Sequence, residues 1–75
     1  MSKQDEIARF CGNVRRHREQ AGLTQRALAE ALETDVGTIV LLEDGVLTDA
    51  VDIEMLFRMC RLFAVDLSAL FRASE

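Results

Sequence analysis

The chain has 75 residues, which is enough for one domain with a single small core, so residues 1–75 are expected to form one domain. Its 49% hydrophobic content and the absence of proline and tryptophan favour a compact helical bundle, and its formal net charge is −4. No stretch reaches the roughly 18 apolar residues of a membrane span, and the polar start MSKQDE does not resemble a secretory signal, so we expect a cytoplasmic protein.

The first predicted helix follows a polar lead, Met1–Glu6, and ends at Gly22. Its inward face has apolar residues at spacings of three and four, with an arginine continuing the face: Ile7, Phe10, Cys11, Val14 and Arg18. Gly12 interrupts this helix at a cost of about 1 kcal/mol relative to alanine. That cost predicts close packing of another helix at Gly12.

Two short helices at a tight turn are predicted within Thr24–Gly45. Thr24 precedes a run of helix-forming residues and is suited to cap their first N–H groups. Asp35 offers a second cap a few residues later, where its negative charge also suits a helix N-terminus. Ile39 and Leu42 then form an inward apolar pair, and Gly45 can take the left-handed conformation that ends a helix. So little chain between two helices predicts a helix-turn-helix.

A fourth helix is expected after the connection Val46–Ala50, capped by Thr48 or Asp49. Its predicted core stripe consists of Ile53, Leu56, Met59, Cys60 and Phe63. Further apolar residues lie off that stripe, namely Met55, Phe57 and Leu62, so the helix is apolar around much of its circumference and should be covered on more than one side. Asp66 is expected to cap a short fifth helix that ends at Leu70 and Phe71.

This pattern resembles the lambda-repressor/Cro-like (XRE-type) helix-turn-helix family from about Val14 to Phe71. The residues that carry the resemblance are Arg18, Gly22-Leu23-Thr24-Gln25, Leu28-Ala29, Ile39, Glu43 with Gly45, Val65-Asp66-Leu67 and Leu70-Phe71. The resemblance implies an all-α, compact five-helix bundle in which Arg18 and Glu43 form a largely buried pair. It also implies dimerisation at the end of the domain, for which Met55, Phe57 and Leu62 are available.

The chain departs from this family in its third helix, which in the family reads base edges in the major groove. Base reading needs hydrogen-bonding side chains, yet the predicted outward residues are Val36, Gly37, Val40 and Leu41. Residues 35–54 contain six acidic residues and no Lys or Arg, a net charge of −6 that opposes phosphate binding. The residues left for DNA contact are Gln25, Arg26, Gly37 and Thr38.

Two hypotheses follow. In the first, the third helix binds a protein, such as a transcriptional activator with a basic or apolar surface that is sequestered by an antiactivator. The binding residues would be Val36, Val40, Leu41, Val46 and Leu47, with an acidic rim of Asp35, Asp44 and Asp49. In the second, the protein is a homodimeric, sequence-specific DNA-binding repressor.

A different register of the third helix would instead place Val36, Val40 and Leu41 in the core. With one histidine and no metal-ligand spacing, no enzyme, cofactor or metal site is expected.

Overall fold

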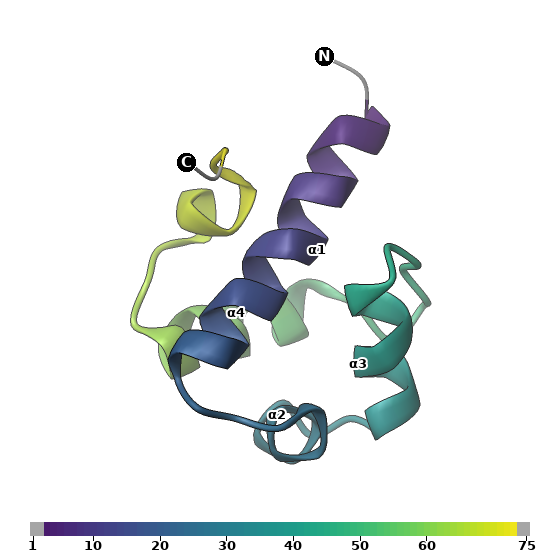
Figure 1. The fold of residues 1–75 in the computed structure, drawn as a ribbon, viewed down its shortest axis with the longest axis vertical. Helices are drawn as coiled ribbons and strands as arrows, with labels where there is room; N and C mark the ends of the chain where they lie inside the picture. Colours follow the sequence, from purple (N-terminus) through teal and green to yellow (C-terminus); the bar gives the residue numbers. More distant parts are fainter. Residues whose placement is uncertain (1–2, 74–75) are drawn as a thin grey trace.

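The computed structural model describes residues 3–73, which fold into four α-helices and one 3-10 helix. These are α1 (Lys3–Gln20), α2 (Gln25–Ala31), α3 (Val36–Glu43), α4 (Ile53–Phe63) and the 3-10 helix η1 (Leu67–Phe71). The long helix α1 contacts both α3 and η1, which lie on opposite sides of it in Figure 1. The predicted all-α class is confirmed, but the predicted bundle of five α-helices is wrong because the last helical segment is 3-10.

Capping side chains begin the three central helices. The side chains of Thr24, Asp35 and Asp52 accept hydrogen bonds from the backbone N–H groups of Ala27, Thr38 and Met55 at 3.0, 2.8 and 3.0 Å. Each satisfies a first-turn N–H that has no partner within the helix. The cap expected for α4 at Thr48 or Asp49 is therefore wrong, because the helix begins later and Asp52 directly precedes it.

The core lies between α1 and the shorter helices, and the predicted inward face of α4 differs from the observed one at two residues. Met55 is only 3% exposed and belongs to the core, whereas Ile53 is 54% exposed. Met55 and Met59 are one turn apart and point inward together, with Leu56, Cys60 and Phe63 partly buried beside them. The expectation that Met55 serves a dimer surface is therefore wrong.

Helix α1 begins earlier than predicted, since residues 3–6 of the polar lead are helical and residues 1–2 lie outside the described residues. A Cβ added at Gly12 would meet nothing within 4 Å. The close helix packing predicted at Gly12 is thus absent from the described part of the chain.

A buried asparagine joins α1 to the C-terminal segment. The Asn13 side chain is fully buried, and its Nδ2 donates to the carbonyl oxygens of Leu70 and Arg72 at 2.9 and 2.7 Å. The rings of Phe10 and Phe71 stack beside it with centroids 5.1 Å apart. These contacts hold η1 against α1 on the side away from α3. Within residues 3–73, no helix is both long and apolar enough to cross a membrane.

Candidate functional site

An ion pair between α1 and the end of α3 fixes the position of α3 relative to α1. Arg18 Nε donates to Glu43 Oε2 at 2.6 Å and Arg18 Nη2 donates to Glu43 Oε1 at 3.0 Å. Arg18 Nη1 also donates to the carbonyl oxygen of Leu23 at 2.8 Å, in the turn between α1 and α2. Two parallel charge-assisted bonds are strong and geometrically specific, so Arg18 joins α1 and the turn before α2 to the end of α3.

The environment of Glu43 keeps its carboxylate charged. Burial works to raise the pKa of Glu43, but hydrogen bonds from Arg18 and Gln25 and the charges of Arg18 and Arg15 outweigh it and lower the pKa. The family resemblance predicts a largely buried pair of Arg18 and Glu43, and their side chains are 12% and 3% exposed.

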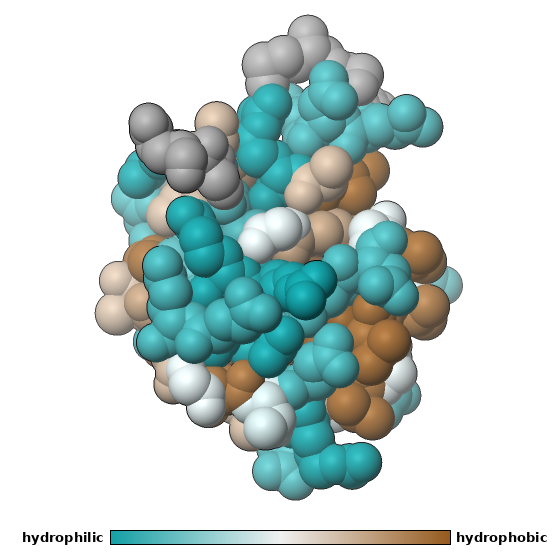
Figure 2. Space-filling view, viewed as in Figure 1, coloured by the Kyte–Doolittle hydropathy of each residue, from teal (hydrophilic) through white to brown (hydrophobic). Residues whose placement is uncertain are grey.

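The outer surface of α3 is apolar. Ile39 and Leu42 are fully buried, while Val40 and Leu41 are 38% and 41% exposed on the opposite side of the helix. The exposed residues Val46 and Leu47 follow directly in the loop after α3. Figure 2 shows the hydrophobic atoms of this region gathered over α3 and the loop that follows it. We call Val36, Val40, Leu41, Val46 and Leu47 the α3 face.

One member of the α3 face differs from the others. Val36 is partly buried and packs against the core, so it supports the fold as well as bordering the exposed surface. The register that would place all of Val36, Val40 and Leu41 in the core does not occur, because Val40 and Leu41 are exposed.

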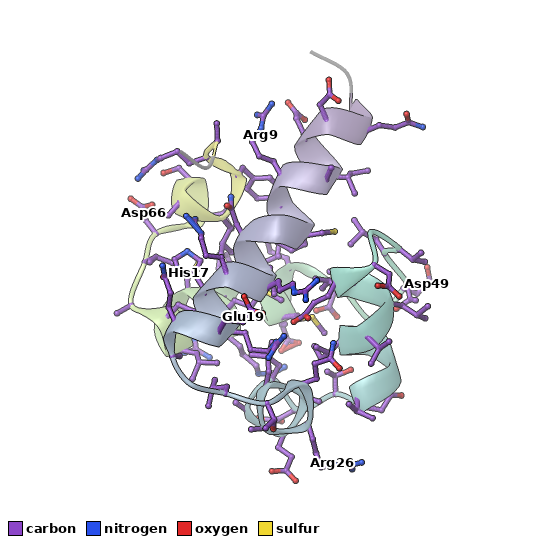
Figure 3. All side chains as sticks on the ribbon, in the orientation of Figure 1. Arg9, His17, Glu19, Arg26, Asp49 and Asp66 are labelled. Carbon is purple, nitrogen blue, oxygen red and sulfur yellow. The ribbon has the colours of Figure 1, made fainter. Side chains whose placement is uncertain are left out.

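The acidic rim consists of Asp35, Asp44 and Asp49, which are all exposed around the α3 face. Asp35 Oδ1 accepts hydrogen bonds from the backbone N–H and the hydroxyl of Thr38, both at 2.8 Å, and these bonds lower the pKa of Asp35. Asp49 lies in the loop after α3, on the same side of the molecule as the α3 face (Figure 3). The rim therefore places negative charge around an apolar surface.

The four residues left for DNA contact offer little to a base or phosphate. Thr38 is only 7% exposed and its hydroxyl donates to Asp35, while Gly37 is exposed but has no side chain. Gln25 Nε2 donates to Glu43 Oε1 at 3.1 Å. The sequence predicted Gln25 only as a residue left for DNA contact, so this second bond to Glu43 was missed. Arg26 is the exposed cation among the four and extends from α2 away from the body of the molecule (Figure 3).

Of the three α4 residues expected from the sequence to serve a dimer surface, Phe57 and Leu62 remain available and Met55 does not. Phe57 and Leu62 are both exposed. They are five residues apart, a spacing that turns an α-helix through about 140°, so they lie on different flanks of α4. Met55 is in the core. Leu62 borders a shallow surface pocket of about 240 Å³ with His17, Gln20, Ala21 and Phe63. His17 stacks on Phe63 there, and Figure 3 shows it on the side of α1 away from α3.

Among residues 3–73, no group of three or more His, Cys, Asp or Glu side chains could hold a metal ion. In the comparisons with known proteins, a family model described as helix-turn-helix matches residues 14–70. Neither the curated proteins nor the solved structures include a match to the chain.

Proposed function

The chain belongs to the lambda-repressor/Cro-like helix-turn-helix family. We propose that it regulates transcription, and that it does so by binding a protein through the α3 face. The partner is a transcriptional activator with a basic or apolar surface, which the protein sequesters in the cytoplasm as an antiactivator does. The site comprises the α3 face and its acidic rim.

The observation that carries this proposal is the chemistry of the outer side of α3. The positions that would face base edges hold Gly37, Val40 and Leu41, and none of these side chains has a hydrogen-bond donor or acceptor. Direct reading of bases depends on such groups. Contiguous exposed apolar residues with a polar rim are instead typical of surfaces that bind proteins.

The charge of the segment around α3 also favours binding to a protein over binding to DNA. Residues 35–54 carry a net charge of −6, and this segment includes α3 and the loop after it. Glu43 is paired with Arg18, which leaves five acidic residues and no Lys or Arg in the segment. DNA affinity rests largely on Lys and Arg that neutralise phosphates, so the segment would repel DNA. The same charge would speed association with a basic protein surface.

The second candidate function is that of a homodimeric DNA-binding repressor. One observation favours it beyond the family match: Arg26 is exposed on α2, next to Gln25 at a position from which helix-turn-helix proteins contact the DNA backbone. A sequence-specific repressor of this kind would need base contacts from residues outside α3.

The proposal is tested with tagged wild-type protein and the variants Val40→Ser and Leu41→Ser as baits in native extract. Leu62→Ser is the matched control, because Leu62 is equally exposed but lies away from α3. We expect the wild type and Leu62→Ser to retain the same transcription regulator, and the two α3 variants to lose it while melting within a few degrees of the wild type. Retention by all four proteins, or recovery of a defined DNA sequence with the wild type, would contradict the proposal.

A further inference from the structure

Gly37 is a glycine that the protein's own fold does not require. It lies in the first turn of α3 with a helical backbone, since the positive-φ glycines of the described chain are Gly22 and Gly45. A Cβ added there would meet only Asp35 Oδ1 at 3.6 Å, which is ordinary van der Waals contact. Glycine is less favourable than alanine within a helix. The contacts within the isolated fold therefore give no reason for a glycine at this position, as at Gly12.

Gly37 differs from Gly12 in its surroundings, because it lies beside the exposed apolar residues of α3. Residues three and four positions apart are neighbours on a helix surface, so Val40 and Leu41 border the place where a side chain of residue 37 would stand. Gly37 has no side chain at this point of an exposed apolar surface that continues to Val46 and Leu47, and we call this point the notch. The distance between packed helices depends on the side chains at their contact, and a glycine permits a close approach.

The charge of the rim restricts the occupant of the notch. A second copy of this chain, bound symmetrically through the same face, would bring two acidic rims of Asp35, Asp44 and Asp49 into one interface. Like charges brought together in an interface are unfavourable. A segment with Lys and Arg beside its apolar residues would complement the rim instead. No strand is present in residues 3–73, so an extended peptide would find no sheet edge there to join.

We infer that the partner docks an amphipathic α-helix onto the α3 face, with its backbone crossing α3 at Gly37 and its basic residues facing the acidic rim. This inference rests on the proposed function and specifies the partner element that the site accepts. Apolar anchors spaced at i, i+3, i+4 and i+7 on the incoming helix would contact Val40, Leu41 and Leu47.

The test uses a designed 18-residue helical peptide (a length chosen to give about five turns) with a leucine stripe at that spacing and lysines on its flanks. A second peptide has glutamate at every lysine position. Their binding to the wild type, Gly37→Ala and Gly12→Ala is measured by fluorescence anisotropy, alongside the melting temperature of each protein. Gly12→Ala is the matched control, because Gly12 is an exposed helical glycine with open space around it on a different helix.

We expect the lysine peptide to bind the wild type at least about tenfold more tightly than the glutamate peptide. Both alanine variants should melt at a higher temperature than the wild type, since alanine favours the helix. Gly37→Ala should nevertheless bind the lysine peptide at least about fivefold more weakly, because a methyl group fills the notch. Gly12→Ala should bind within about twofold of the wild type.

Equal binding of the two peptides, or unchanged binding by Gly37→Ala, would overturn the inference. So would a wild-type dimer in sedimentation that Gly37→Ala dissociates, since the occupant would then be a second copy. If Leu41→Ser loses the native regulator while Gly37→Ala retains it, this inference fails and the proposed function stands. If Leu41→Ser also retains the regulator, the proposed function itself has failed.

Discussion

Arg18 and Glu43 meet in a two-bond fork, with Nε to Oε2 at 2.6 Å and Nη2 to Oε1 at 3.0 Å, between the last turn of α1 and the last residue of α3. Ile39 and Leu42 anchor the inner side of α3 in the core, and the fork fixes its end. Together they leave Val40 and Leu41 on the outside. The exposure of the α3 face is thus a consequence of this anchoring.

Removing one partner of the fork should destabilise the fold strongly. In Arg18→Ala the Glu43 carboxylate, which is 3% exposed in the wild type, would lose its cation, and such a loss costs about 3–5 kcal/mol. Arg15→Ala, which removes a 59% exposed arginine paired with Glu19, should cost about 0.5 kcal/mol or less. Urea denaturation of the two variants measures both values. Nearly equal stabilities would show that the fork contributes no more than a surface ion pair.

The stability of the protein should fall in acid partly through Glu43. The folded-state pKa of Glu43 lies below its ordinary value of 4.5, so the stability from its charge is fully present above about pH 4.5. That stability is lost as the pH falls through the lower, folded-state pKa. Urea denaturation at a series of pH values from 7 to 3 should therefore show a smaller acid loss for Glu43→Gln than for the wild type. An identical acid loss in both proteins would exclude this role for Glu43.

Ala64 ends α4 in the left-handed conformation, with φ 57°. This conformation costs a residue with a Cβ about 1–2 kcal/mol, and the greater freedom of an unfolded glycine offsets part of the gain from replacing it. Ala64→Gly should therefore stabilise the protein by about 0.5–1 kcal/mol. Ala8→Gly, the same change at an exposed position within α1, should destabilise it by a similar amount. Thermal melts that shift in the same direction for both variants would refute this account of the α4 terminus.

Duplex DNA should bind only weakly at physiological salt. Selection from random duplexes at about 0.15 M salt, where charges are screened beyond about 8 Å, should return no defined sequence because α3 offers no base-reading side chain. Asp44→Lys with Asp49→Lys should raise non-specific DNA affinity and steepen its salt dependence. A discrete motif enriched by the wild type would support the repressor hypothesis instead.

Local signals predicted the helix-turn-helix correctly. Thr24, Asp35 and Gly45 act at the ends of α2 and α3 through hydrogen bonds and backbone preferences that depend on a few neighbouring residues. The family pattern predicted the pair of Arg18 and Glu43, and helical periodicity alone predicted the lack of polar residues on the outer side of α3.

Features that depend on distant contacts were not predictable in this way. In α4, apolar residues occupy most positions around the helix, so periodicity could not distinguish the buried Met55 from the exposed Ile53. The burial of Asn13 depends on carbonyl oxygens 57 and 59 residues away. A cap at Asp66 is compatible with either an α or a 3-10 helix after it, and the sequence did not separate the two.

The most direct test of protein binding through the α3 face is photo-crosslinking in living cells with a benzophenone amino acid in place of Leu41. The same substitution at Leu62, which is as exposed as Leu41 but lies on α4, serves as the control position. We expect a discrete adduct between residue 41 and a transcription regulator, and no such adduct from residue 62. Absence of a protein adduct at residue 41, together with recovery of a specific DNA segment bound to the protein, would contradict the claim that α3 contacts a protein.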